Sequence, residues 1–161
     1  MPNEIFLRAV TEFDLPLLFK QQLDSDATQM AAFPSRDRDA FMAHWAKIMA
    51  DDSKILKAIL FDSQVAGNIV CWESSGEWEV GYWIGKEFWG KGIATQALSL
   101  FLNLVKTRPL YAHVARHNIA SWRVLEKCGF KLTGEDKYFN PGGEEVEEFI
   151  LKLGGQEKET Q

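Results

Sequence analysis

Residues 79–95, EVGYWIGKEFWGKGIAT, decide how the rest of the chain is interpreted. The stretch passes from an apolar, strand-like segment through a glycine-rich turn into a helical pattern. Gly85, Gly90 and Lys91 have the spacing of a phosphate-binding P-loop, but Gly92 stands where that loop needs Ser or Thr. The competing interpretations are a different phosphate-binding turn and a tight strand-to-helix connection without a ligand.

The residues of this turn argue against a nucleotide hydrolase. Four bulky side chains at 86–89 would keep backbone N–H groups away from a phosphate, and Gly92 has no hydroxyl for Mg²⁺. A dinucleotide fingerprint would need glycine at Thr95, and the preceding strand comes fourth in a run of mostly hairpin-linked strands. From Gly90 onward, the turn opens directly into a helix whose first N–H groups have no intrahelical partner. Such a helix start binds a pyrophosphate without a metal.

The composition predicts a single packed domain. Of 161 residues, 46% are hydrophobic and 12% aromatic, which favours a buried core over disorder. The net charge of −5 disfavours nucleic acid as the main partner. No run reaches the ~18 apolar residues of a membrane span, and the N-terminus lacks the pattern of a secretory leader. With two cysteines, we expect a cytoplasmic protein with reduced thiols.

Hydrophobic periodicity predicts an α/β domain over residues 4–153, followed by a flexible tail at 154–161. The predicted element order is β-α-α-β-β-β-α-β-α-β-β. Strands are expected at 4–10, 53–61, 64–73, 76–85, 109–115, 130–139 and 144–153. Helices are expected at 11–22, 37–51, 92–106 and 118–129. The glutamates at 144, 145, 147 and 148 predict an edge strand kept soluble by charge, or a surface that attracts a cationic amine.

Three segments together resemble the GNAT superfamily of acyl-coenzyme A-dependent N-acetyltransferases. The family motif [Q/R]-x-x-G-x-[G/A] is similar to WGKGIA at 89–94, although Trp89 stands where many members have Gln or Arg. EVGYWI at 79–84 resembles the fourth strand of the family, and NIASWRVLEKCGFKLTGE at 118–135 resembles its Asn-x-x-Ser segment. FLRAVTEFDLPLL at 6–18 is similar to the usual first strand and helix. WGKGIAT and EKCGF resemble most closely the branch of the ribosomal-protein alanine acetyltransferases.

This resemblance implies a single-domain fold with a mixed, mostly antiparallel sheet, splayed fourth and fifth strands and about four flanking helices. It implies acetyl-CoA as cosubstrate and direct attack on the thioester by a primary amine, either a protein N-terminus or a small amine. The protein is expected to be a monomer or homodimer. The residues implied to bind acetyl-CoA are Gly81, Tyr82, Trp83, Ile84, Trp89, Gly90, Lys91, Gly92, Ile93, Ala94, Thr95, Asn118 and Ser121.

Three side chains are candidates for proton transfer. Glu79 resembles in position the glutamate that deprotonates the amine in some members, although strand alternation could equally turn it to solvent. Ser121 is the candidate that returns a proton to the sulfur, and Tyr138 is its rival. Asn118 is expected to cap a helix and also to contact the cosubstrate. The alternative function is a non-catalytic acyl-CoA sensor, which needs the same glycines but no proton path.

Other side chains are weaker candidates, each with a structural explanation. Arg116 and Arg123 flank the second motif and are candidates for the 3′-phosphate of coenzyme A. His113 and His117 have metal-like spacing, but a strand-to-loop stretch need not bring them together, so no metal site is expected. Cys128 is expected in the core. Three aromatic residues either line the acceptor side or belong to the core: Phe33, Trp45 and Trp72.

Overall fold

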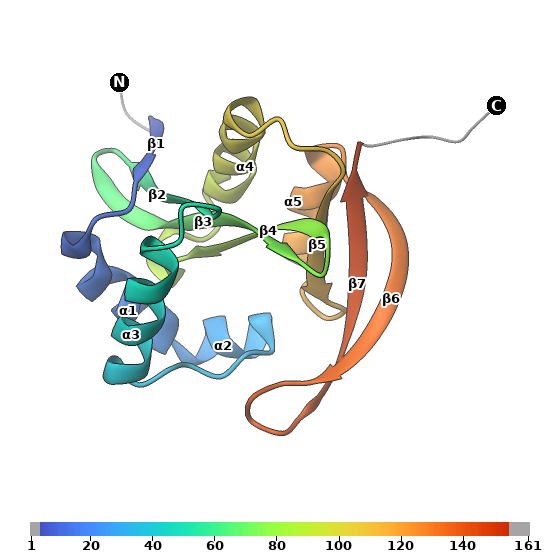
Figure 1. Ribbon diagram of the computed structural model, residues 1–161, viewed down its shortest axis with the longest axis horizontal. Helices are drawn as coiled ribbons and strands as arrows, with labels where there is room; N and C mark the ends of the chain where they lie inside the picture. The colour runs from blue at the N-terminus through green and yellow to red at the C-terminus, as the bar shows by residue number, and fades with distance from the viewer. Residues whose placement is uncertain (1–3, 155–161) are drawn as a thin grey trace.

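The structure is a computed structural model that describes residues 4–154. These residues form one seven-stranded sheet in the order β1-β2-β3-β4-β5-β7-β6, with helices on both faces (Figure 1). The strands are β1 (Ile5–Ala9), β2 (Ile55–Phe61), β3 (Gln64–Ser74), β4 (Glu77–Ile84), β5 (Leu110–Ala115), β6 (Lys131–Phe139) and β7 (Glu145–Leu153). The α-helices are α1 (Leu15–Leu23), α2 (Ser25–Ala31), α3 (Arg38–Met49), α4 (Ile93–Leu104) and α5 (Ile119–Lys127). Short 3-10 helices η1 (Glu12–Asp14) and η2 (Lys86–Phe88) precede α1 and α4.

The strand order confirms the predicted mixed, mostly antiparallel α/β sheet. Every neighbouring pair is antiparallel except β4 and β5, which are parallel. The hairpin predicted at residues 62–63 is present: Asp62 and Ser63 have φ of 49° and 69°, as a two-residue turn between twisted strands requires. All strands formed by the described residues belong to this one sheet. The predicted tail lies, beyond Gly154, outside the described residues.

The fourth and fifth strands separate, as the resemblance implies. They pair only at Trp78 with Leu110 and at Glu79 with Tyr111. From Val80 to Ile84 the edge of β4 that faces β5 has no strand partner among residues 4–154, while its other edge pairs with β3 along its whole length. The unpaired backbone groups of β4 therefore remain available at this gap.

The two faces of the sheet carry separate cores. Helices α4 and α5 cover one face, where Leu98, Phe101 and Leu125 are buried. Helices α1 and α3 cover the other face, where Leu18 and Phe41 are buried. Alternation along each strand decides which core a side chain enters, so neighbouring residues on β4 face different helices. In the described part of the chain, no helix is both long enough and apolar enough to cross a bilayer.

Helix α2 was not predicted, and it matters for the site. It begins at the N-cap Asp24, whose side chain accepts a hydrogen bond from Ala27 N at 2.9 Å, and it ends at Ala32 with φ of 56°. Its seven residues are too few to show a helical apolar period, so the sequence predicts no helix between residues 22 and 37. Including α2, five α-helices flank the sheet in the described chain instead of about four.

The prediction that the acidic run 144–148 forms an edge strand is wrong. Strand β7 lies between β5 and β6 and pairs with both of them, so β6 is the edge strand. The order of strands in a sheet is set by long-range pairing, which the charge of a segment does not reveal. Glu148 is consequently buried, with 8% of its surface exposed.

Candidate functional site

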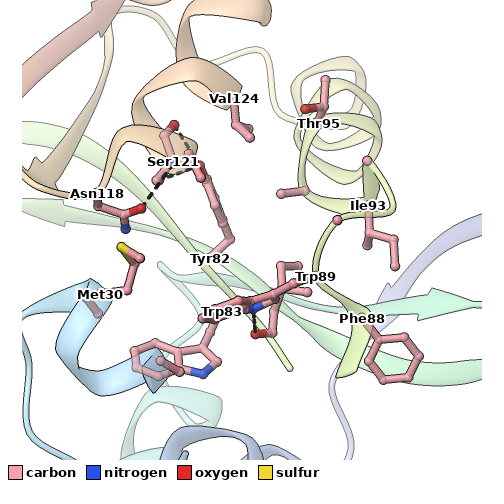
Figure 2. A pocket seen from close by; sticks show the side chains of 17 residues that line it. Met30, Tyr82, Trp83, Phe88, Trp89, Ile93, Thr95, Asn118, Ser121 and Val124 are labelled. Atoms are coloured by element: carbon pink, nitrogen blue, oxygen red, sulfur yellow. Dashed lines mark hydrogen bonds between the residues drawn. The ribbon is translucent and has the colours of Figure 1, made fainter. Parts of the chain in front are cut away.

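A cavity of about 390 Å³ lies beside the end of β4 that has separated from β5, between α2, α4 and α5 (Figure 2). Its size falls within the ~300–1,000 Å³ range of small-molecule sites. Most of the lining is apolar, with a few polar groups at its ends. The lining residues are Ala27, Met30, Ala31, Tyr82, Trp83, Ile84, Phe88, Trp89, Gly90, Gly92, Ile93, Ala94, Thr95, Asn118, Ala120, Ser121 and Val124.

This cavity brings together most of the residues predicted to bind the cosubstrate. Eleven of those thirteen line it, and Gly81 and Lys91 do not. A Cβ atom at Gly81 would lie 3.3 Å from the Trp72 ring, so the packing of Trp72 across the opposite face accounts for this glycine. Lys91 is exposed to solvent beside the turn.

The start of α4 forms one end of the cavity. Gly90 and Gly92 have φ of 78° and 74°, a left-handed conformation that strains any side chain with a Cβ. Gly92 is the N-cap, and no side chain caps the helix. The first intrahelical bond runs from Gln96 N to Gly92 O, so the N–H groups of the first turn remain available for a ligand. This helix end is suited to an anion.

Trp89 closes the connection that leads into α4. Its indole Nε1 donates a hydrogen bond to the carbonyl of Ile84 at 2.9 Å, across the 3-10 turn (Figure 2). The departure from Gln or Arg at this position therefore has a structural account. The ring fastens the end of β4 to the glycine turn and also contributes to the cavity wall.

Ser121, Tyr82 and Asn118 form the polar end of the cavity. The Tyr82 hydroxyl lies 2.7 Å from Ser121 Oγ, and Asn118 Oδ1 accepts the Ser121 N–H at 3.2 Å (Figure 2). The second bond is the predicted helix cap. Burial raises the pKa of Tyr82 to about 12, so its hydroxyl keeps its proton at neutral pH. The partnership of Tyr82 with Ser121 was missed, because only the fold brings residues 82 and 121 together.

Helix α2 forms the opposite wall and is held at both ends. Ala27, Met30 and Ala31 contribute its lining side chains, and Met30 points into the cavity (Figure 2). Near its start, Asp26 forms an ion pair with Lys86 of the connection before α4. Near its end, the carbonyl of Gln29 lies 2.7 Å from His117 Nε2. The unpredicted helix thus spans the gap between the β4 and β5 sides.

The other two catalytic candidates lie outside this cavity. Glu79 is the last paired residue of β4 before the gap, and its side chain is 18% exposed. It faces away from α4 and α5, opposite to its neighbour Val80, which belongs to their core. Tyr138 lies on β6 and does not line the cavity. Burial, and secondarily the charge of Glu148, raise the pKa of Tyr138.

Glu79 belongs to a cluster of charged groups contributed by four strands. His113 Nε2 of β5 lies 3.7 Å from Glu79 Oε1, and His113 Nδ1 lies 2.6 Å from Glu148 Oε2 of β7. Asp136 of β6 has a carboxylate oxygen within 4.8 Å of a ring nitrogen of His113 and of a carboxylate oxygen of Glu148. The Glu148 bond raises the pKa of His113, whereas burial raises the pKa of Glu79. This cluster was not predicted.

The two histidines considered for a metal do not face each other. His113 is bonded to Glu148, and His117 approaches the carbonyl of Gln29. Arg116 is also committed elsewhere: its guanidinium bonds Glu135 at 2.9 Å and lies over the Phe149 ring at 5.1 Å. Arg123 is exposed.

A second, more open cavity of about 760 Å³ lies between the end of α2 and the start of β7. Phe33 lines it, whereas Trp45 is buried in the core between α1 and α3. The cavity carries both signs of charge. Its lining residues are Thr28, Gln29, Ala32, Phe33, Pro34, Arg116, His117, Glu144, Glu145, Val146 and Glu147.

Comparison with known families and structures agrees with this geometry. Residues 4–131 match the family model of the acetyltransferase (GNAT) domain. A search of curated proteins found no significant match.

Solved structures share the fold at low sequence identity. A GNAT-family acetyltransferase from Bacillus anthracis is 19% identical with a TM-score of 0.80, over 95% of this chain and 96% of that one. A ribosomal-protein-alanine N-acetyltransferase from Brucella melitensis is 20% identical with a TM-score of 0.76, over 91% and 98%. A spermidine N-acetyltransferase from Vibrio cholerae, solved with CoA and spermine, is 20% identical with a TM-score of 0.76, over 92% and 95%.

Proposed function

Because the chain belongs to the GNAT acetyltransferase family, an acyltransferase class of enzymes, we propose that it transfers acetyl from acetyl-CoA directly to a primary amine. The observation that carries this proposal is the cavity beside the end of β4 that has separated from β5. One wall offers unpaired strand backbone, and one end offers an uncapped helix start. An extended pantetheine arm and a pyrophosphate need those two features.

The residues present fit acetyl-CoA. The backbone of β4 from Val80 to Ile84 can bond the amides of the pantetheine arm as an added strand. The first-turn N–H groups of α4 can bind the pyrophosphate, aided by the positive end of the helix dipole. Apolar side chains, Ile93 and Val124 among them, would surround the aliphatic parts. Acetyl-CoA itself supplies the activated thioester, so no protein nucleophile is required.

We assign the two proton transfers to side chains on opposite faces of the sheet. Ser121 lines the cavity and its hydroxyl is held by Tyr82, so we assign Ser121 the return of a proton to the departing thiolate. Glu79 lies at the start of the gap on the other face, and we assign it the proton of the amine. Tyr138 shares that other face and is the weaker candidate for the donor.

The acceptor is proposed to be a cationic amine in its resting state, either a peptide N-terminus or a small amine. The cavity between α2 and β7 is lined by Glu144, Glu145 and Glu147, which favour a positively charged acceptor in that cavity. The similar structures from Brucella and Vibrio are named for a ribosomal protein and for spermidine, and both of those acceptors present amines. We propose a cytoplasmic location, where acetyl-CoA is available.

Thermal unfolding with and without acetyl-CoA tests the binding step. A ligand at 100 times its Kd adds about 2.7 kcal/mol to the stability of the folded state. For a chain of this size the midpoint should rise by roughly 5–12 °C. ATP with Mg²⁺ and NADPH serve as controls and should produce no comparable shift. A shift with ATP–Mg²⁺ and none with acetyl-CoA would overturn the proposal.

Release of free thiol from acetyl-CoA in the presence of amines tests catalysis. Peptides with free N-termini, spermidine and small primary amines form the acceptor panel. Stabilisation by acetyl-CoA without turnover for any of them would favour the alternative, a non-catalytic acyl-CoA sensor.

A further inference from the structure

The cluster around His113 joins four strands at the point where the sheet opens. His113 lies between two carboxylates, with Nε2 3.7 Å from Glu79 and Nδ1 2.6 Å from Glu148. The side chains of His113, Glu79 and Glu148 are 27%, 18% and 11% exposed. Water therefore solvates these charged groups only partly, so each of them is strongly influenced by the charges of its neighbours.

A cation beside Glu79 favours the ionised form of its carboxyl group, which is the form that can accept a proton. A carboxylate that is largely withdrawn from water is more easily protonated, and burial is the main cause of the raised pKa of Glu79. Glu148 and Glu77 push the pKa in the same direction, since each is a like charge. The charge of His113 is the only influence that lowers it among the described residues.

Glu148 fixes His113 in the position and charge state that Glu79 requires. The short bond to Nδ1 directs Nε2 toward Glu79 and favours the imidazolium form. The charged groups that face His113 are Glu79 from β4, Glu148 from β7 and Asp136 from β6. When all four groups are charged, two negative charges remain uncompensated, which suits an approaching ammonium group.

We propose that His113 is a positioning residue that keeps the Glu79 carboxylate oriented and ionised, and that Glu148 holds His113 for this task. The inference deepens the proposed function, because it rests on Glu79 as the group that receives the proton of the amine. The juxtaposition itself is independent of turnover and is tested without it.

The first experiment follows the Glu79 carboxyl by ¹³C NMR in protein labelled at the glutamate side chain, with a chelator present. Glu79→Gln identifies the signal. In His113→Gln, the Glu79 titration midpoint should rise, because the neighbouring cation is gone. His113→Lys should hold it near the wild-type value, because a cation is retained. Glu77→Gln is the matched control: it removes a like charge without touching His113 and should leave the midpoint unchanged or lower it.

The second experiment follows the His113 imidazole by NMR. Glu148→Gln should lower its titration midpoint, because the bond that favours the imidazolium is weakened. Glu135→Gln is the matched control, since Glu135 lies beside Asp136 on β6 but bonds Arg116 instead. An unchanged His113 midpoint in Glu148→Gln would contradict the role given to Glu148.

The third experiment measures kcat/KM against pH with an amine that the wild-type protein acetylates. The acidic limb should move to higher pH in His113→Gln and return in His113→Lys. The loss in His113→Gln should be largest at acidic pH and should be recovered as the pH rises above the shifted Glu79 midpoint. The inference is overturned if the limb and the Glu79 midpoint do not move in His113→Gln, or move equally in His113→Lys. Absence of wild-type turnover would count against the proposed function alone, because the two NMR experiments still decide the inference.

Discussion

At the scale of single residues, the Ser121 hydroxyl is held by a partner 39 residues away in the sequence. Tyr82 and Ser121 share a 2.7 Å hydrogen bond at the wall of the cavity, and burial keeps the Tyr82 proton in place. This bond fixes the direction of the Ser121 hydroxyl at the cavity wall. Tyr82 is therefore expected to position Ser121, which remains the proposed proton donor.

Substitutions of Ser121, Tyr82 and Tyr138 are expected to show by their effects on kcat which hydroxyl donates the proton. Ser121→Ala should lower kcat by about 10²-fold or more with little change in KM, because a proton donor acts mainly in the transition state. Tyr82→Phe should lower kcat by a smaller factor, since Ser121 remains. Steady-state kinetics with acetyl-CoA and one good amine measures both. A larger loss in Tyr138→Phe than in Ser121→Ala would reverse the assignment.

Gly67 is a position that only the packed structure reveals as indispensable. A Cβ atom there would lie 2.0 Å from the carbonyl oxygen of Trp83, in the strand beside the cavity. We expect Gly67→Ala to destabilise the protein by about 1–3 kcal/mol, because the two strands must move apart. Urea unfolding measures this difference. Gly134→Ala is the matched control on the edge strand, where an added Cβ meets no atom within 4 Å.

At the scale of secondary structure elements, α2 is the part of the site that depends most on local signals. It is short, it is capped by Asp24, and its polar contacts to Lys86 and His117 are exposed. Exposed contacts of this kind add little stability. The helix should therefore loosen before the sheet does, and the cavity wall with it.

Asp24→Ala should consequently weaken substrate binding more than global stability. Loss of the cap costs about 0.5–2 kcal/mol of helix stability. Because Ala27, Met30 and Ala31 line the cavity, the KM for acetyl-CoA should rise while kcat changes less. Asp37→Ala is the matched control: Asp37 caps α3 with the same geometry, at 2.8 Å from Ala40 N, and α3 does not line the cavity. Equal effects on KM in both variants would contradict the role of α2.

At the scale of the whole molecule, stability should fall toward both ends of the pH range. Asp14 binds both guanidinium nitrogens of Arg8 at 2.8 Å, and this bond is the main reason that the pKa of Asp14 is lowered. A lowered acidic pKa adds stability above its unfolded value of about 3.9, and that stability is lost as the pH falls through the folded value. The raised pKa of His113 acts in the opposite sense. Its contribution is complete below about 6.5 and is lost as the pH rises through the folded value.

Urea unfolding measured across the pH range tests this expectation. Asp14→Asn should flatten the acidic side of the stability curve, and His113→Gln should flatten the neutral to alkaline side. A curve that Asp14→Asn lowers equally at all pH values would mean that Asp14 contributes through packing or capping and not through its charge.

Local patterns determined a large part of this protein. The glycine turn at 90–92, the hairpin at 62–63 and the cap at Asn118 depend on neighbours within a few residues, and each was predicted where the structure has it. Of the thirteen residues that the family resemblance predicted to bind acetyl-CoA, eleven line one cavity. Seven residues of α2 carried too little periodicity to be found, because a short helix shows barely two turns of its apolar face.

Only the tertiary structure decided which distant side chains meet. The place of β7 inside the sheet, the bond between Tyr82 and Ser121, and the contacts of His113 with Glu79 and Glu148 all follow from long-range strand order. Sequence alternation tells which residues share a face of a strand, but not which strand lies beside it. Alternative backbone pairings between strands compete, and the packing of the whole chain selects one of them. The charge pattern of one segment does not decide which.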